Sequence, residues 1–320
     1  MSFELIKPGT RIDFIGQRRL CALLSVLVIC ASFVAIPIQG IRLGIDFAGG
    51  NEMQVQFVDS EVDETAIRGV LGNLPDIEDA SVVRFGAESQ NEFLVRFRAS
   101  EDTEAGQTID DSDTELPGED RVQRFQEALE DDLGDVVIQR VEFVGPRVGA
   151  ELQSDGLMSL FWASLAILAY VAFRFSSRFA PGAVVAVIHD LLVTAGIFVI
   201  LGLEFDLRIL AAMLAILGYS LNDTIIIYDR IRENMELRTK ADLEEVLNLS
   251  VNQTLARTVL TSGTTLAALL ALYLLGGEVI RPFAFAMLIG VAVGTYSSIY
   301  IASPLLLLLE GRAGREAEAS

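Results

Sequence analysis

The sequence is poor in the residues from which enzyme and metal sites are most often built. Its 320 residues include one histidine, two cysteines and one tryptophan. Cys21 and Cys30 share one apolar run, and on a helix they would lie roughly 13 Å apart along the axis, too far for a disulfide. No Cys-x-x-Cys pair is present, so neither a metal site nor a redox motif can be recognised. We therefore expect no metal ion, no cofactor and no covalent catalysis.

Basic residues are also scarce. There are 24 Lys and Arg residues against 44 Asp and Glu residues, for a net charge of −20. This balance argues against a nucleic-acid-binding protein and against a polybasic protein of the membrane surface. The acidic residues are concentrated, because residues 39–150 hold 26 acidic and only 9 basic side chains.

Charged residues of either sign are few, and the sequence contains long apolar runs. Charged residues make up 21% of the chain and hydrophobic residues 52%, with a mean hydropathy of +0.45. A soluble domain of this length is seldom so apolar. The sequence therefore predicts a polytopic α-helical membrane protein with one strongly acidic water-soluble domain, at 39–155.

Six apolar runs come close to the roughly 20 residues that span a bilayer. The first, 20–38, is long for the apolar part of a signal peptide and no small-x-small cleavage site follows it, so we predict an uncleaved spanning helix. The other five form a bundle within 156–309, at 157–173, 183–203, 207–228, 255–275 and 283–309.

Basic residues set the expected orientation. They precede the first run, lie between the second and third, and follow the fourth and the sixth (Lys7, Arg11, Arg18, Arg19; Arg174, Arg178; Arg230, Arg232, Arg238, Lys240; Arg312, Arg315). All of these positions fall on one side, which the positive-inside rule makes cytoplasmic. We expect an inner-membrane protein whose ends, 1–19 and 310–320, are both cytoplasmic and whose acidic domain is periplasmic. An amphipathic cytoplasmic helix is predicted at 230–254, to pack on the bundle or to dock a partner.

The acidic domain has the pattern of a β-α-β-β-α-β fold. Met53, Val55 and Phe57 alternate with polar residues, as in a half-buried strand. Further strands are predicted at 81–85, 92–98 and 136–144, and helical stripes at 62–74 and 122–133. This order predicts a ferredoxin-like split-βαβ domain. Residues 100–120 are polar and acidic and predict a solvated loop, with a docking site as the alternative.

Two charged residues inside the apolar runs are the leading candidates for function. Asp223 and Arg257 lie equally far from the shared cytoplasmic ends of the fourth and fifth runs, so antiparallel helices would place them at a similar depth, roughly 8 Å inside the boundary. A lone charge there is costly, by roughly 3 kcal/mol on insertion scales. We expect the two to pair, which lowers this cost and makes the proton affinity of the Asp223 carboxyl group depend on the position of Arg257. The alternative is that Arg257 only extends to the interface while Asp223 supports local structure.

Polar residues near this pair favour the functional interpretation. Ser220, Asn222, Thr224 and Thr261 are among the side chains that suggest a hydrated interior face. His189 and Asp190 lie inside the third run, but successive side chains on a helix diverge, so we do not expect a dyad. They predict bundle packing, with a role in proton movement as the alternative. Asp46, Gly49 and Gly50, just after the first run, are typical of a tight turn and of no nucleotide-binding loop.

Several motifs together resemble the SecF branch of the SecD/SecF family of protein-export membrane proteins, within the resistance-nodulation-division superfamily. They are 44–50 (GIDFAGG), 144–152 (VGPRVGAEL), His189-Asp190, 218–234 (GYSLNDTIIIYDRIREN) and 253–265 (QTLARTVLTSGTT). The motifs occur in the family's order, and the resemblance covers roughly residues 14 to 309.

The resemblance implies a subunit that uses the proton gradient to assist late protein export, with Asp223 and Arg257 in proton transport. It implies SecD, the SecYEG translocon and an unfolded secretory polypeptide as partners, with YajC and YidC as further candidates. A scaffold that only holds SecD and the translocon together is one alternative. A proton-coupled small-molecule efflux subunit is another, although such pumps carry two halves of this kind in one chain.

Overall fold

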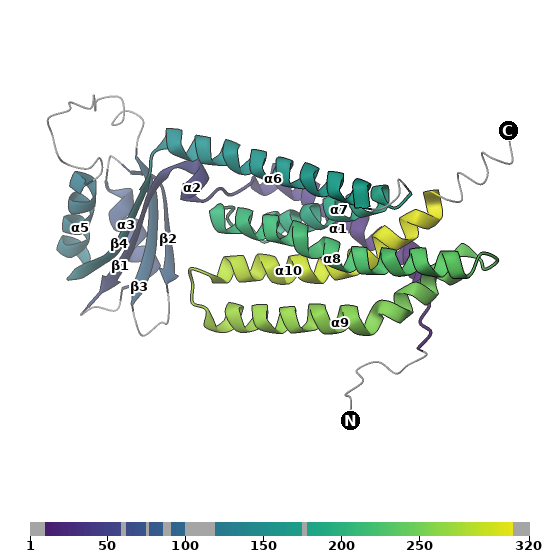
Figure 1. The fold of residues 1–320 in the computed structure, drawn as a ribbon. Helices are drawn as coiled ribbons and strands as arrows, with labels where there is room; N and C mark the ends of the chain where they lie inside the picture. Colours follow the sequence, from purple (N-terminus) through teal and green to yellow (C-terminus); the bar gives the residue numbers. More distant parts are fainter. Residues whose placement is uncertain are drawn as a thin grey trace. The chain divides into compact units, whose positions relative to one another are not determined.

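Figure 1 shows the fold of the computed structural model, which describes residues 10–58, 62–74, 77–85, 91–99, 119–174 and 178–309. The chain divides into two compact units. One consists of the residues up to Arg42 and from Gly156 onward, and the other is Leu43–Asp155. The predicted acidic loop lies outside the described residues except for its last two, which begin a helix.

The smaller unit is a four-stranded antiparallel sheet with helices. In chain order its elements are α2 (Ile45–Ala48), β1 (Gly50–Phe57), α3 (Glu64–Gly72), β2 (Ile77–Phe85), β3 (Glu92–Ala99), α5 (Glu119–Leu133) and β4 (Val136–Val144). The strand order is β2-β3-β1-β4, and each neighbouring pair is antiparallel. Strand β2 begins at Ile77, earlier than predicted, because the acidic residues at its start hide the apolar alternation.

One face of this sheet carries the core of the smaller unit. Met53, Val55 and Phe57 are almost completely buried, and the polar residues between them are only partly buried, so the predicted alternation is confirmed. They pack in one cluster with Val95 and Phe97 of β3 and with side chains of α3 and α5 (Ile67, Val70, Leu71, Phe125 and Leu129). The two helices therefore cover the apolar face that the strand periodicity creates.

In the described part of the larger unit, six helical segments are long and apolar enough to cross a membrane. They are α1 (Arg18–Gln39), α6 (Pro146–Arg174), α7 (Ala180–Ile200), α8 (Leu207–Leu237), α9 (Leu243–Leu275) and a last segment, Arg281–Leu309, which contains α10 (Arg281–Ser297) and the π-helical turn η3 (Ser298–Ala302). Each predicted span is thus a helix. Cys21 and Cys30 are free thiols, as their spacing predicts.

Three helices extend beyond the predicted spans. Helix α6 begins at Pro146 rather than at residue 157, because a proline suits a first helical turn and the polar residues after it are compatible with a helix. The predicted helix at 230–254 is not a separate element: α8 runs on to Leu237, and α9 begins at Leu243. Hydropathy marks only the apolar part of a helix. Val246, Leu247 and Ser250 of α9 are buried, so this segment packs on the bundle, the first of its two predicted alternatives.

The bundle has an inner and an outer set of helices. In the most apolar 18-residue stretch of each helix, the buried share is 56% in α7, 50% in α8 and 50% in the last segment. It is only 17% in α1, 11% in α6 and 11% in α9. Helix α10 lies beside both α8 and α9 (Figure 1). The fold therefore encloses most of the polar side chains on α7, α8 and α10 that face the bundle interior.

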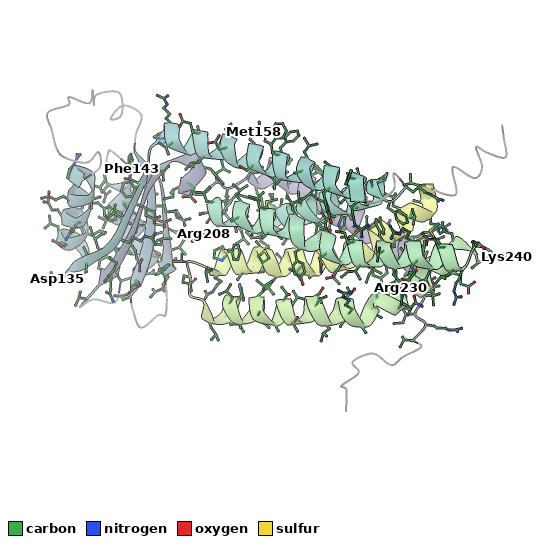
Figure 2. The ribbon with its side chains drawn as sticks, viewed as in Figure 1. Asp135, Phe143, Met158, Arg208, Arg230 and Lys240 are labelled. Atoms are coloured by element: carbon green, nitrogen blue, oxygen red, sulfur yellow. The ribbon has the colours of Figure 1, made fainter. Side chains whose placement is uncertain are left out.

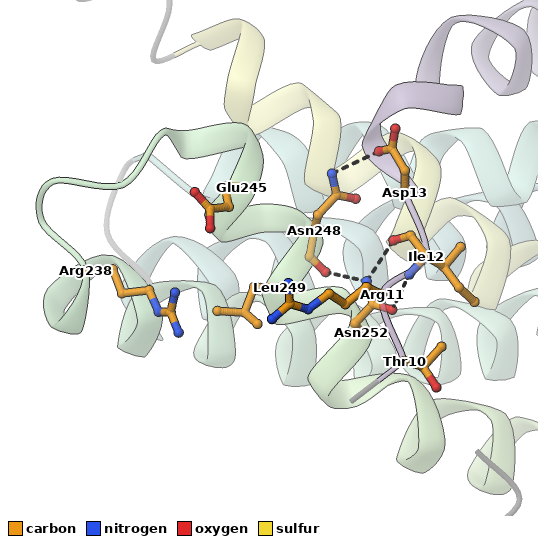
Figure 3. Close-up of a pocket in the computed structure, with 9 residues that line it drawn as sticks. All are labelled: Thr10, Arg11, Ile12, Asp13, Arg238, Glu245, Asn248, Leu249 and Asn252. Atoms are coloured by element: carbon orange, nitrogen blue, oxygen red, sulfur yellow. Dashed lines mark hydrogen bonds between the residues drawn. The ribbon is translucent and has the colours of Figure 1, made fainter. Parts of the chain in front are cut away.

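The segment before the first helix is fixed to the start of α9. Asn248 accepts hydrogen bonds from the backbone N–H groups of Phe14 (2.9 Å) and Ile15 (3.0 Å). One turn later, Asn252 accepts from Ile12 N (2.9 Å) and donates to Ile12 O (2.8 Å). Figure 3 shows these amides beside a cavity of about 290 Å³, which Arg11, Arg238 and Glu245 also line.

Apart from Asp223, the charged side chains of α8 gather at its two ends. Figure 2 shows Arg208 at one end and Arg230 near the other, towards Lys240 in the turn that follows. Arg208 pairs with Asp206 (Nε–Oδ2 2.7 Å), which also caps the helix by accepting from Ile209 N (2.9 Å). The helix between these ends matches the apolar thickness of a bilayer.

Candidate functional site

Asp223 lies where α8, α9 and α10 meet. Its side chain is 1% exposed. Oδ2 accepts hydrogen bonds from Ser262 Oγ of α9 (3.0 Å) and from Thr295 Oγ1 of α10 (3.1 Å). The two hydroxyls also contact one another at 2.8 Å. One carboxyl group thus joins three spanning helices.

The Asp223 carboxyl group has few donors. Thr295 Oγ1 carries one hydrogen but contacts three acceptors, Asp223 Oδ2, Ser262 Oγ and Val291 O, so it donates to one of them at a time. Oδ1 is buried and has no hydrogen-bond partner among the described residues. A carboxylate has about four acceptor positions, and an unpaired buried charge is costly. The site therefore has a free oxygen on which a proton can bind without displacing a donor.

Arg257 does not lie against Asp223. Its side chain is exposed on the outer surface of α9, and in the described part of the chain it forms no ion pair. The helix geometry gives the reason: Ser262, which contacts Asp223, lies five residues later, roughly 140° around the helix. The predicted equal depth and pairing are therefore wrong: α9 brings Ser262, not Arg257, level with Asp223, because equal offsets along the sequence fix neither the register nor the facing of two packed helices.

The polar residues predicted around Asp223 divide into two groups. Ser220 and Thr224 are buried, and Thr224 Oγ1 contacts Ser298 Oγ at 2.7 Å. Asn222 is exposed. The Thr261 hydroxyl bonds within its own helix, to the carbonyls of Arg257 and Thr258, although the Thr261 carbonyl accepts from Tyr219 Oη of α8 (3.3 Å). Only the first group therefore belongs to the enclosed polar region.

His189 and Asp190 form a second buried site. His189 Nδ1 lies 2.9 Å from Asp190 Oδ1, although the residues are adjacent. Asp190 Oδ2 accepts from Ser297 Oγ of α10 (2.8 Å) and from Ser220 Oγ of α8. The expectation that neighbouring side chains must diverge is wrong here, since the imidazole can turn back along the helix towards the carboxylate.

The second site extends to α1. His189 Nε2 contacts Ser25 Oγ at 2.9 Å, and Ser25 Oγ contacts Tyr296 Oη of α10 at 3.1 Å. Tyr296 Oη donates to the backbone carbonyl of Cys21 (2.6 Å). A continuous chain of hydrogen bonds thus joins α1, α7, α8 and α10.

The two carboxylates share the interface between α8 and α10. Ser220 and Asp223 are about one turn apart on α8, and Thr295 and Ser297 belong to adjoining turns of α10. Gly294 makes this approach possible, because a Cβ there would lie 3.1 Å from the Cα of Ser220. A movement of α8 against α10 would therefore disturb both sites together.

The glycine pair that follows the first helix is a packing element of the smaller unit. Asp46 belongs to α2, and Gly49 and Gly50 have positive φ angles of 74° and 129°. A Cβ on Gly49 would lie 2.9 Å from the Cα of Pro146, and one on Gly50 would lie 3.0 Å from the carbonyl oxygen of Phe97. These glycines permit a turn and two close backbone approaches, in keeping with the predicted tight turn.

Sequence reasoning missed several members of these sites. Ser25, Thr295, Tyr296 and Ser297 lie in apolar runs and were not singled out. The cluster of hydroxyl residues in the last run was an available signal, but nothing in the sequence shows which helix they face. Among the described residues, no three His, Cys, Asp or Glu side chains are placed to hold a metal ion.

Comparisons with known proteins find similarity to membrane proteins of protein export. Residues 124–312 match the family described as protein export membrane protein SecD/SecF, C-terminal, and residues 34–61 match the SecD/SecF GG motif. The chain is 41% identical to the protein translocase subunit SecF of Calditerrivibrio nitroreducens, over 96% of this chain and 97% of the relative. It is 43% identical to that of Magnetococcus marinus, over 99% and 97%.

A solved structure has the same fold. The crystal structure of SecDF, a translocon-associated membrane protein from Thermus thermophilus, superposes with a TM-score of 0.81 at 34% identity. The match covers 95% of this chain but only 39% of the SecDF chain. The family model matches more than half of the chain, and two relatives matched over nearly their full length are 41% and 43% identical to it. The chain therefore belongs to the SecD/SecF family of protein-export membrane proteins.

Proposed function

We propose that this chain is an auxiliary subunit of the Sec export machinery that acts with SecD and uses the proton gradient to drive late translocation of secreted proteins. Its relatives are named protein translocase subunit SecF, and the solved relative is described as translocon-associated. The SecYEG translocon and the unfolded secretory polypeptide are its proposed partners, and YajC and YidC are further candidates. The mechanism needs no covalent catalysis.

The observation that carries the proton-coupled part is the Asp223 carboxyl group. It is enclosed by three helices, accepts from Ser262 and Thr295 on one oxygen, and has a free second oxygen. Adding a proton there removes a charge from the bundle interior, and losing it restores the charge. Since the two donors come from α9 and α10, a change in charge alters how strongly both helices are attracted to α8.

Arg257 has a proposed role that requires a covering surface. Its guanidinium lies on the exposed face of α9, within an apolar helix, where contact with lipid would be costly. We propose that a membrane helix of the SecD partner covers this face, so that Arg257 influences protons at the subunit interface. Asn222, also exposed, belongs to the same class of interface residues.

The smaller unit is the proposed periplasmic domain. Its order of strands and helices and its β2-β3-β1-β4 sheet support a ferredoxin-like fold. The basic residues between the helices support the orientation with both ends of the chain in the cytoplasm. Helices α1 and α6 connect directly to this domain, so movements in the bundle can be passed to it.

The test is export of a reporter by cells that carry Asp223→Asn. We expect the variant to lose the gradient-dependent part of export while it still co-purifies with SecD. Asp229→Asn is the matched control, because Asp229 is exposed on the same helix and pairs with Arg232 (3.5 Å) near its end. Equal gradient-dependent export by Asp223→Asn and the control would contradict the proton role.

A scaffold without proton coupling is the second candidate. The outer faces of α1, α6 and α9 are largely uncovered, as expected of helices that contact other membrane subunits. A scaffold predicts that Asp223→Asn exports normally and that only changes which weaken co-purification with SecD reduce export. The same experiment therefore separates the two functions.

A further inference from the structure

The contacts around His189 can be compared with the hydrogens available to form them, because each side chain brings a known number of hydrogens. Four contacts run in sequence: Asp190 Oδ1 to His189 Nδ1, His189 Nε2 to Ser25 Oγ, Ser25 Oγ to Tyr296 Oη, and Tyr296 Oη to Cys21 O. The last acceptor is a backbone carbonyl and the first is a carboxylate oxygen, and neither brings a hydrogen.

A neutral histidine does not supply enough hydrogens for these contacts. Neutral His189, Ser25 and Tyr296 bring one hydrogen each, three in all, for four contacts. Whichever way the hydroxyls turn, one contact between electronegative atoms, at 2.6 to 3.1 Å, would then lack a hydrogen. One additional proton completes the chain: Tyr296 donates to Cys21, Ser25 to Tyr296, and both ring nitrogens of His189 donate.

The surroundings of the pair fit this additional proton. Asp190 also accepts from Ser297 and Ser220, so each hydrogen bond that it forms with the described residues has a donor on the other side, as a carboxylate requires. The groups that face His189 are Ser25 on α1, Asp190 on α7 and Tyr296 on α10, with Cys21 on α1 reached through Tyr296 and Ser220 on α8 reached through Asp190. Among these, Asp190 is the one that carries a charge, so a protonated pair has no net charge in the bundle interior.

We infer that the chain of hydrogen bonds from Cys21 to Asp190 holds one proton more than a neutral histidine beside a carboxylate, and that His189 and Asp190 form a second proton-binding site of the bundle. The proton can lie on the imidazole or on the Asp190 carboxyl group, and both arrangements complete the same four bonds. This inference deepens the proposed function and rests on it for its role in export.

Loss of the proton would act on α1. With three hydrogens left, one of the four contacts loses its bond. The bond from His189 Nδ1 to the Asp190 carboxylate is charge-assisted and is the one best kept, so the loss falls on a contact among His189, Ser25, Tyr296 and Cys21. These three contacts all lie where α1 meets α7 and α10. Helix α1 leads directly into the smaller unit. The second site therefore links a protonation step to the helix that precedes the proposed periplasmic domain.

The test uses the one histidine of the chain. The full-length protein, purified with a histidine-free tag, is labelled with ¹⁵N-histidine and placed in phospholipid bilayers with unlabelled SecD partner. Because the sequence has a single histidine, every ring signal belongs to His189. Solid-state NMR over a pH series measures whether each ring nitrogen carries a hydrogen. Infrared spectra of wild type and Asp190→Asn show whether the carboxyl group is protonated.

We expect either two protonated ring nitrogens or a protonated Asp190 carboxyl band at neutral pH. Tyr296→Phe removes two of the four contacts and one hydrogen, so the additional proton is no longer needed, and its occupancy ratio should fall about tenfold at equal pH. Tyr300→Phe is the matched control, because the Tyr300 ring contacts Tyr296 while the Tyr300 hydroxyl takes no part in the four hydrogen bonds.

Two results would overturn the inference. One is a wild-type ring with a bare nitrogen beside an ionised Asp190 at neutral pH. The other is Tyr296→Phe with the same titration as wild type. Neither measurement uses a gradient or export. The inference can therefore fail while Asp223→Asn still abolishes gradient-dependent export, and it can hold while Asp223→Asn exports normally.

Discussion

Replacing Gly294 by alanine should disturb both buried carboxylates with one methyl group. The new Cβ would lie 3.1 Å from both the Cα and the Cβ of Ser220 and 3.4 Å from its Oγ. Carbon atoms in favourable contact lie about 3.5 to 4.0 Å apart, so α8 and α10 would have to separate by roughly half an ångström. The obstacle includes backbone, which cannot turn away as a flexible side chain can.

The expected magnitude follows from two opposing effects. Alanine is favoured over glycine in a helix by about 1 kcal/mol, whereas overpacking a close contact costs about 1 to 3 kcal/mol. Separation of the helices also lengthens the bonds of Ser220 and Ser297 to Asp190 and that of Thr295 to Asp223. We expect Gly294→Ala to be about 1 to 3 kcal/mol less stable than a glycine-to-alanine change in open space.

Gly218→Ala on α8 supplies that comparison, because a Cβ there would meet nothing within 4 Å. Both variants are measured for unfolding in lipid or detergent and for gradient-dependent export. Gly294→Ala should be the less stable and should lose most of its gradient-dependent export, while Gly218→Ala keeps both. Equal stability and export in the two variants would refute the view that close contact of α8 and α10 holds the carboxylate sites together.

Three further predictions concern the ends of the bundle and the smaller unit. Asn248→Leu removes the acceptor for two backbone N–H groups and should release the segment before the first helix, seen as faster amide exchange at Phe14 and Ile15; unchanged exchange would contradict this. Asp206→Ala removes the cap of α8 and should lower stability by about 1 kcal/mol in thermal unfolding, with no loss if the cap is unimportant. Gly49→Ala should increase proteolysis of the smaller unit, because φ is positive and Pro146 is close, whereas protection equal to wild type would show that the turn can adjust.

The parts of the fold that follow from burial pattern alone were predictable. Alternation located β1 because one face of a sheet is buried, and six apolar runs located six spanning helices because a bilayer sets their length. Helix ends were less predictable. Residues 146–156 and 229–237 are polar enough to end a hydropathy window, yet they continue helices because backbone hydrogen bonding does not depend on apolarity.

The candidate site was predictable as a location and not as an arrangement. Asp223 and the hydroxyl residues near it stand out in an apolar run, since polar residues within a membrane span are costly unless they are paired or have a function. Its donors could not be assigned, because Ser262 and Thr295 are 39 and 72 residues from Asp223 and their facing depends on how α9 and α10 pack. Arg257 shows the same limit: residue counting predicted it level with Asp223, whereas the packed helices bring Ser262 to that level and leave Arg257 exposed.

The placement of the two carboxylates explains why a proton at one site can affect the other without direct contact between them. Asp190 takes its donors from α8 and α10, and Asp223 sits on α8 and takes donors from α9 and α10. A change of charge at either site alters the attraction between α8 and α10, and that interface supplies donors to both. The two proposed proton-binding groups share this interface, so the packing itself would couple them. Helix α1 is bonded to His189 and not, among the described residues, to Asp223, so α1 would respond to a change of charge at the His189–Asp190 site.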